Sequence, residues 1–179
     1  MLRLFAALEV PADLAEDLIP RQYGLAGARW RPADTLHITL RFYGDLAESQ
    51  AADLDAELAR VRSAPFELEL AGVGAFGEGH QLHALWAGVK DSEPLRVLAG
   101  RCESAARRAR VKIEARAYRP HVTLAYLDRH ADPQRTADWL SINARLASAP
   151  WLVTWFGLYS SHRTGEGSRY DLEREHPLA

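Results

Sequence analysis

The stretch Leu36-His37-Ile38-Thr39-Leu40 determines how this chain is organised, because Pro120-His121-Val122-Thr123-Leu124 repeats its pattern nearly half a chain later. Both segments read His-x-Thr-Leu with a β-branched residue at x. A chain with this content of His, Thr and Leu would contain roughly 0.03 such copies by chance. Two copies therefore indicate a duplicated structural unit.

Each copy is typical of a β-strand with one polar face. Successive side chains of a strand point to opposite faces, so His37 and Thr39 share one face while Ile38 and Leu40 share the other. The second copy divides in the same way. If the apolar faces enter a core, each strand presents one imidazole and one hydroxyl to a common groove.

The composition of the chain is that of an ordinary folded protein and excludes several kinds of site. The 179 residues are 47% hydrophobic and 26% charged, which is typical of a folded soluble protein. The net charge of −2 gives no overall attraction to nucleic acid or acidic membranes. The single cysteine, Cys102, excludes an intrachain disulfide and a multi-cysteine zinc site. No apolar run has the length of a signal peptide or membrane span, so we expect a cytoplasmic protein without a membrane partner.

One segment departs from this even charge balance. Seven arginines and lysines between Arg101 and Arg119 face only Glu103 and Glu114. Two interpretations stay open, a solvated helix face and a patch directed at a polyanion.

Hydrophobic periodicity predicts helices interleaved with strands. Helices are expected at residues 12–25, 48–62, 92–110 and 133–146, and strands at 2–10, 28–31, 36–43, 66–70, 82–89, 121–127, 151–159 and 169–172. The glycine-rich segment 72–79 lacks the Gly-Lys-Ser/Thr ending of a phosphate-binding loop and is predicted to be a turn. We predict a single α+β domain, residues 1–179, whose two duplicated lobes of sheet and helix surround a central cleft.

Two histidines on opposite walls of a groove suit acid–base catalysis near neutral pH. The hydroxyls of Thr39 and Thr123 can donate hydrogen bonds to an anion held between the imidazoles. A phosphodiester fits, because in-line displacement places the attacking and leaving oxygens on opposite sides of phosphorus. A 2′,3′-cyclic phosphate is the most economical substrate, since ring strain favours opening.

This chemistry needs no metal or other cofactor. A two-metal site would need carboxylates beside the histidines, and neither motif contains one. The opposing interpretation, two unrelated structural histidines, fits a single copy better than a matched pair. The remaining histidines are expected at the surface: His80, His83, His130, His162 and His176.

These residues resemble the 2H phosphoesterase superfamily, and within it the RNA 2′,3′-cyclic phosphodiesterases, also called 2′-5′ RNA ligases. The likeness extends over nearly the whole chain. It includes Leu4-Phe5-Ala6-Ala7-Leu8, Trp30-Arg31-Pro32, both motif strands, Leu85-Trp86-Ala87-Gly88-Val89, Leu158-Tyr159-Ser160-Ser161 and Tyr170-Asp171-Leu172.

The resemblance implies a bilobal fold with pseudo-twofold symmetry and hydrolysis of an RNA or nucleoside 2′,3′-cyclic phosphate to the 2′-phosphate. His37 would be the general acid that protonates the departing 3′ oxygen, His121 the base that activates water, and Thr39 and Thr123 the phosphate ligands. Members of this family also join an RNA end that carries a 2′,3′-cyclic phosphate to a 5′-hydroxyl end through a 2′-5′ linkage. Expected partners are RNA or nucleotides with 2′,3′-cyclic phosphate ends, including tRNA fragments, and we expect a monomer.

The chain departs from the family pattern at one position. Many relatives carry arginine two residues after the second motif, where this chain has Tyr126. Strict alternation places Tyr126 on the face opposite Thr123, and Arg41 and Arg119 are candidates to replace the missing charge. Tyr118, Phe42 and Trp30 are candidates to stack on a base, with core packing as the alternative. Tyr118 and Tyr126 complete the predicted substrate contacts.

Two further functions stay open at this point. One is an RNA- or tRNA-binding module that keeps the groove without turnover. The other keeps the chemistry but acts on a different small substrate, such as a 2′-5′ oligonucleotide or a cyclic ADP-ribose phosphate.

Overall fold

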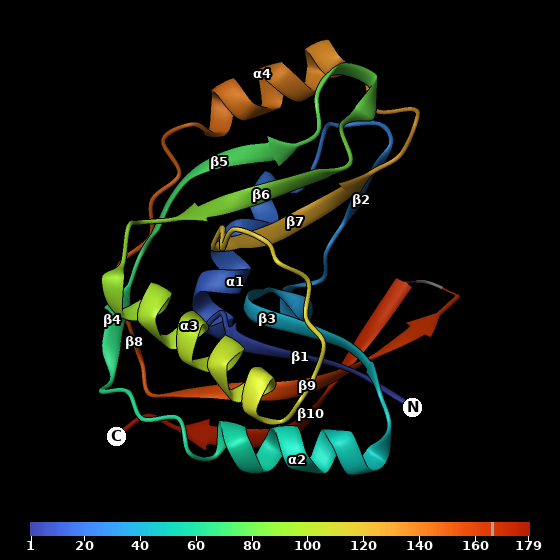
Figure 1. The fold of residues 1–179 in the computed structure, drawn as a ribbon. Coiled ribbons are helices and arrows are strands. Elements are labelled where there is room, and N and C mark those ends of the chain that lie inside the picture. Colours follow the sequence, from blue (N-terminus) through green and yellow to red (C-terminus); the bar gives the residue numbers. More distant parts are fainter. Residues whose placement is uncertain (166) are drawn as a thin grey trace.

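The computed structural model describes residues 1–165 and 167–179 as a mixed α+β protein (Figure 1). Its elements in chain order are β1 (Leu2–Glu9), α1 (Ala12–Leu18), β2 (Ala28–Trp30), β3 (His37–Leu46), α2 (Glu48–Leu58), β4 (Phe66–Leu68), β5 (Leu70–Phe76), β6 (Ala84–Val89), α3 (Glu93–Arg108), β7 (His121–Leu127), α4 (Pro133–Asn143), β8 (Trp151–Val153), β9 (Trp155–Thr164) and β10 (Gly167–Pro177). The predicted α+β class is confirmed.

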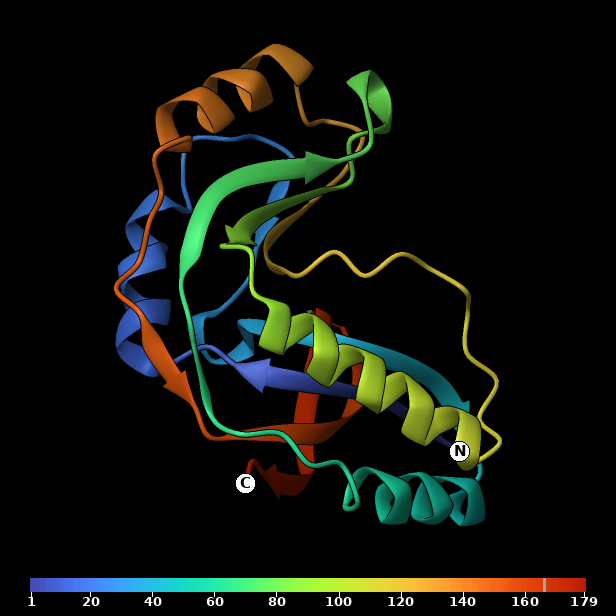
Figure 2. The same cartoon turned by 60° about the vertical axis from the view of Figure 1, so that its left-hand side comes forward.

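One antiparallel sheet carries the fold. Its strands follow the order β10-β9-β1-β3-β7-β6-β5, with β2 alongside β7, and β4 and β8 form a separate pair. The two motif strands, β3 and β7, are neighbours at the centre of this order. Figure 2 shows the half with β5 and β6 curving away from the half with β1 and β9, with α2 and α3 beside the second half and α4 beside the first.

The core lies behind the motif strands. Ile38 and Val122 have no exposed surface, and the motif leucines Leu40 and Leu124 are buried with them. The motif histidines and threonines are only partly buried, so each strand has the apolar and polar faces that the sequence predicts. Leucines of α2 and α3 complete the core: Leu54, Leu58, Leu95 and Leu98.

Helices α3 and α4 begin at capping residues that the sequence supplies. The Ser92 side chain accepts a hydrogen bond from the Leu95 N–H (3.3 Å) at the start of α3. The Asp132 carboxylate accepts one from the Arg135 N–H (2.8 Å) at the start of α4, and Pro133 follows it at the first helical position. These caps place both helix starts within one residue of the prediction.

Two predictions about the first half are wrong. Helix α1 ends at Leu18 and continues only as a 3-10 turn over Ile19–Arg21, because Pro20 has no N–H to extend the α-helical ladder. The glycine-rich segment is mostly strand β5, not a turn. A Cβ at Gly74 would lie 2.2 Å from the Trp86 indole, so this glycine serves close packing of a ring.

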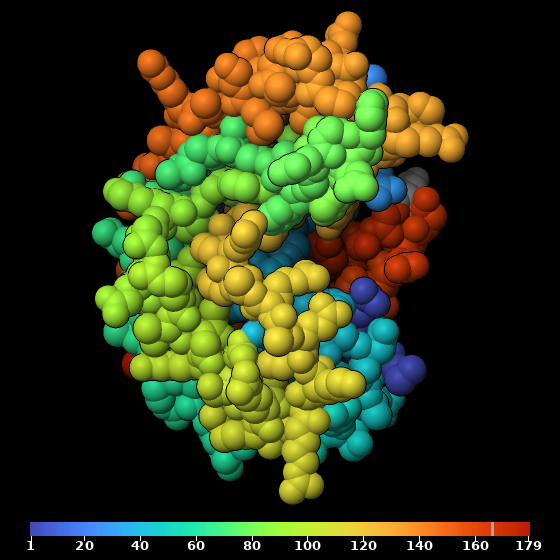
Figure 3. All heavy atoms as spheres, turned by 45° about the horizontal axis from the view of Figure 1, so that its top comes forward, coloured from blue at the N-terminus to red at the C-terminus, as the bar shows by residue number. Residues whose placement is uncertain are grey.

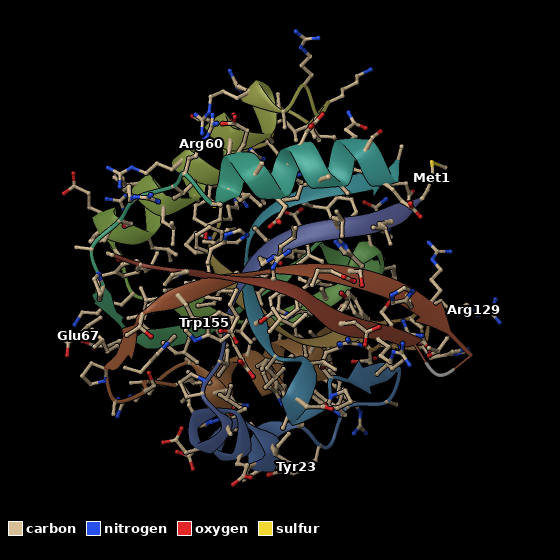
Figure 4. The ribbon with its side chains drawn as sticks, turned by 90° about the horizontal axis from the view of Figure 1, so that it is seen from below. Met1, Tyr23, Arg60, Glu67, Arg129 and Trp155 are labelled. Atoms are coloured by element: carbon tan, nitrogen blue, oxygen red, sulfur yellow. The ribbon has the colours of Figure 1, made fainter. Side chains whose placement is uncertain are left out.

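The C-terminal strands also differ from the prediction. The expected strand over 151–159 divides into β8, which pairs with β4, and β9, which pairs with β1. The hairpin of β9 and β10 is longer than expected, and it crosses the underside of the molecule (Figure 4). His176 on β10 is therefore buried, with its ring 4.9 Å from that of Phe156, and the predicted surface position is wrong.

Candidate active site

The two motif strands meet at one residue pair, Ile38 with Val122. Continuing this antiparallel register by one residue sets His37 opposite Thr123 and Thr39 opposite His121. The two histidines are then diagonal neighbours, a relation in which backbone positions typically lie about 7–8 Å apart. His121 lies close enough to His37 to contribute to lowering the pKa of that imidazole.

A hollow opens on the surface at this level. Figure 3 shows it between the β5–β6 connection in green, the segment before β7 in yellow and the β9–β10 hairpin in red. Atoms with the blue-cyan colour of residues around 30–40 lie on its floor. Part of the chain around residues 30–40 is thus accessible from outside through this opening.

Both imidazoles are oriented by the same backbone contact. His37 Nδ1 lies 2.8 Å from the Thr35 carbonyl oxygen, and His121 Nδ1 lies 2.6 Å from the Arg119 carbonyl oxygen. A carbonyl only accepts, so each Nδ1 carries a proton and each Nε2 is left to exchange one. The spacing of two residues is identical in both copies.

Aromatic rings flank each histidine. The His37 ring lies 5.1 Å from those of Phe5 and Tyr170, between centroids. The His121 ring lies 4.8 Å from Phe76 and 6.3 Å from Trp86. Phe5 and Trp86 come from β1 and β6, the strands that flank the motif pair. These walls fix the ring orientations and reduce the water around them.

Burial dominates the electrostatics of both histidines. It lowers the pKa of His37 to about 4, against the opposing effect of the Thr35 carbonyl, and Arg31 and His121 lower it further. Burial also lowers the pKa of His121, again opposed by a backbone hydrogen bond, here to Arg119. Both imidazoles are therefore neutral at pH 7 when no anion lies between them.

A β-bulge follows the threonine in each motif. Ala6 and Ala7 of β1 pair with Arg41 and Thr39, so Leu40 is an extra residue of β3. Leu85 and Trp86 of β6 pair with Ala125 and Thr123, which makes Leu124 the extra residue of β7. An extra residue shifts the alternation by one position and bends the strand. The residues after each motif leucine consequently change face.

The bulge on β7 overturns the expected position of Tyr126. Strict alternation puts it opposite Thr123, but the burial pattern changes phase at Leu124 and Ala125, both buried, and leaves Tyr126 39% exposed. Tyr126 therefore shares the face of His121 and Thr123. Tyr126 remains a predicted substrate contact. Strict alternation would have turned its side chain away from the histidine face, and the bulge turns it back.

Arg31 is a residue that the sequence interpretation missed as a site candidate. It is 7% exposed, and its Cζ lies 5.6 Å from the ring centroids of both Tyr126 and Tyr170. Among the described residues, its Nη2 is buried without a hydrogen-bond partner. The sequence offered one signal for a role of Arg31, its place within Trp30-Arg31-Pro32, a segment that resembles the family.

The predicted arginine substitutes lie differently. Arg41 forms an ion pair with Glu103 of α3 and is 3.5 Å from the Glu114 carbonyl oxygen. The bulge at Leu40 turns it toward α3, so we leave Arg41 out of the proposed site. Arg119 is exposed, and its backbone carbonyl holds His121. A contact between the Arg119 side chain and the substrate remains a prediction.

The base-stacking candidates also divide. The Trp30 ring lies 5.7 Å from Trp139 of α4, which favours the packing alternative. Tyr118 packs against the core with its hydroxyl buried, and burial raises its pKa. Phe42 is exposed, with the Arg3 guanidinium 4.9 Å from its ring centroid.

The basic stretch is partly neutralised within the protein. Arg107 pairs with Glu103 (2.6 Å), and Arg108 pairs with Glu57 (2.5 Å). Arg116 lies 3.4 Å from Glu114. The helical part of the stretch therefore favours the interpretation of a solvated helix face.

Within residues 1–165 and 167–179, no three His, Cys, Asp or Glu side chains gather closely enough to hold a metal ion. In the same part of the chain, no helix is long and apolar enough to cross a membrane.

The fold and the paired strands define a class of bilobal α+β proteins with two His-x-Thr strands at the centre of the sheet. A model of the 2′-5′ RNA ligase superfamily matches residues 10–165. The chain belongs to this superfamily.

Relatives and solved structures agree with this placement. The chain is 30% identical over 172 residues to an RNA 2′,3′-cyclic phosphodiesterase of Escherichia coli, covering 94% of this chain and 92% of that protein. A protein of the same name from Archaeoglobus fulgidus is 34% identical over 101 residues, and this match spans 55% of the chain and 57% of the relative. The crystal structure of E. coli LigT complexed with 3′-AMP superposes with a TM-score of 0.81 at 25% identity, covering 99% of this chain and 98% of that one.

Proposed function

We propose that this protein hydrolyses RNA or nucleoside 2′,3′-cyclic phosphates to 2′-phosphates, by paired acid–base catalysis on His37 and His121. The observation that carries the proposal is the shared orientation of the two imidazoles. Each Nδ1 is held by a carbonyl two residues earlier, and the Ile38–Val122 pair joins the two strands that carry the histidines. The names of the relatives support the same reaction.

The proposed reaction is a single in-line displacement. His121 Nε2 takes a proton from water as the water oxygen forms a bond to phosphorus. The bond between phosphorus and the 3′ oxygen breaks, and His37 Nε2 gives that oxygen a proton. The products are a 2′-phosphate and a 3′-hydroxyl, and the two histidines recover their starting states by exchanging protons with solvent. Thr39 and Thr123 donate hydrogen bonds to the non-bridging oxygens.

The acid must be protonated before it can act, although burial keeps His37 neutral in the empty site. A bound phosphodiester places a negative charge beside the ring. This charge raises the pKa of His37, because the protonated imidazole then faces an anion. Substrate binding therefore prepares the acid. His121 needs no such change, since its pKa is lowered and the base must be neutral.

The same arrangement allows ligation. A 5′-hydroxyl in place of water would lose its proton to His121 and form a 2′-5′ phosphodiester as the 3′ oxygen leaves. Ligation then depends only on whether a second RNA end occupies the position of water.

The test is hydrolysis of 2′,3′-cyclic mononucleotides in excess chelator. We expect His37→Ala and His121→Ala each to lower kcat/KM by about 10²–10⁴-fold. The control is His130→Ala, an exposed residue between β7 and α4, which retains wild-type activity. Wild-type rates in both motif variants would contradict the mechanism.

Two further measurements, of RNA binding and of reaction products, distinguish the two alternative functions. A binding module would bind RNA tightly in a salt-dependent manner without cleaving the cyclic phosphate, and its binding would survive loss of both histidines. Product analysis with 2′-5′ oligonucleotides and cyclic ADP-ribose phosphate identifies a different small substrate.

A further inference from the structure

The backbone of Arg31 is fixed on both sides. Its N–H donates to the carbonyl of Leu124, the bulge residue of the second motif, at 2.8 Å. Its carbonyl accepts a hydrogen bond from Gln22 Nε2 at 3.0 Å. Pro32 follows and restricts the chain further. The Arg31 side chain therefore projects from a fixed backbone position just after β2, beside the second motif.

The guanidinium is enclosed by aromatic rings. Its Cζ lies 5.6 Å from the centroids of Tyr126 and Tyr170, within the range of a cation–π contact. Tyr170 in turn lies 5.1 Å from the His37 ring. One tyrosine thus contacts both the arginine and the first histidine, and the other belongs to the face of the second.

Among the described residues, no carboxylate balances the charge on this side chain. Arg31 is 7% exposed and hydrogen-bonds with the Tyr170 side chain, but its buried Nη2 has no hydrogen-bond partner among the described residues. Taking a cation out of water is unfavourable unless an anion and hydrogen bonds compensate it. Such a group is expected where an anionic ligand supplies the missing partner.

We propose that Arg31 binds the reacting phosphate, with guanidinium N–H groups, those of Nη2 among them, donating to the non-bridging oxygens of the cyclic phosphate. This inference rests on the proposed function, because it assigns the occupant of the same site. Arginine suits the role, since its planar donors match two phosphate oxygens at once. Arg31 also lies close enough to His37 to add to the effect of burial, which is the main cause of the lowered pKa of that imidazole.

The test compares R31M and R31K with R29M. Arg29 lies two residues earlier, within β2, and its Cζ is 5.8 Å from the Tyr126 ring, but its side chain is exposed. We expect R31M to lower kcat/KM for 2′,3′-cyclic mononucleotides about 10–100-fold. R31K should recover part of this loss, because it restores charge without the two parallel donors. R29M should stay within about twofold of wild type.

A second measurement separates binding from structural support. Inorganic phosphate should raise the Tm of the wild type and of R29M but leave that of R31M unchanged. Without phosphate, R31M should be at least as stable as the wild type, because an uncompensated charge has been removed. If R31M instead loses stability and keeps the phosphate effect, Arg31 is structural and the proposal fails.

The phosphate concerned is identified by using substrates with and without a 5′-phosphate. A loss that R31M shows equally on both supports contact with the reacting group. A loss confined to the 5′-phosphorylated substrate would place Arg31 on the neighbouring phosphate and overturn the proposal. If the wild type hydrolyses neither substrate, the proposed function fails, and the Tm measurement alone then decides whether Arg31 binds phosphate.

Discussion

Ile38 of β3 and Val122 of β7 form the paired position that joins the two motif strands, and neither side chain has any surface exposed to solvent. The residues on either side of this pair are the four polar residues of the motifs. Buried packing at Ile38 and Val122 therefore joins the two strands at the level of these four polar residues. The apolar x position of His-x-Thr-Leu is as much a part of the site as the histidine.

Shortening the Ile38 side chain should destabilise the fold in proportion to the atoms removed. We expect Ile38→Val to cost about 0.5–1.5 kcal/mol and Ile38→Ala about 2–5 kcal/mol of unfolding free energy. Urea denaturation measures both. Ile142 of α4 is 79% exposed, and its replacement by alanine should change stability by less than about 0.5 kcal/mol. Equal effects at the two positions would show that Ile38 is not a core contact.

Removing either motif hydroxyl should weaken catalysis without unfolding the protein. Thr39→Val and Thr123→Val preserve side-chain shape but cannot donate to a phosphate oxygen, so each should lower kcat/KM about 3–10-fold, the effect of one hydrogen bond. Thr→Ser at the same positions should retain most activity. The matched control is Thr154→Val, at an exposed position between β8 and β9. Full activity in both motif valine variants would exclude the threonines as phosphate ligands.

The pH at which kcat/KM is highest should lie below the pKa of an ordinary histidine. This parameter reports groups of the free enzyme, and burial lowers the pKa of both imidazoles, that of His37 to about 4. We expect a bell-shaped profile with its maximum below pH 6.5. The profile of kcat should be shifted upward, because the bound phosphate raises the pKa of His37. Steady-state rates from pH 4 to 9 test this, and a kcat/KM maximum above pH 7 would contradict it.

Stability should also decrease as the pH is lowered, because of His37. Between pH 6.5 and about 4 the unfolded chain takes up a proton on this residue that the folded protein excludes, so acid favours unfolding in this window. The free energy of unfolding is therefore highest above pH 6.5 and should decrease by about 1–2 kcal/mol, through His37, as the pH is lowered from 7 to 5. His37→Gln should flatten the dependence by that amount in urea denaturation, whereas His80→Gln, at an exposed position, should keep the wild-type dependence. Parallel curves for all three proteins would contradict the buried environment of His37.

Much of the site follows from local pattern. The period of two in a strand separates His37 and Thr39 from Ile38, and the structure keeps this division. Strand β7 begins and ends at the predicted residues because Pro120 and the apolar alternation after it mark both limits. Prediction was wrong where packing replaced local preference, as at Gly74, whose missing side chain makes room for the Trp86 ring inside a strand.

The remaining features depend on neighbours that are distant in sequence. A bulge is a relation between two strands, so the change of face at Leu124 becomes visible only once β6 pairs with β7. Arg31 looks like any strand arginine until Leu124, Tyr126 and Tyr170 are placed around it.

The sequence by itself determined that two strands each present one imidazole and one hydroxyl, because that follows from alternation within a few residues. Only the tertiary structure decided that Tyr126 and Arg31 join the same face and that Arg41 leaves it. The physical reason is that alternation is a local property of the backbone. Register, burial and an unbalanced charge are instead set by segments that meet after folding.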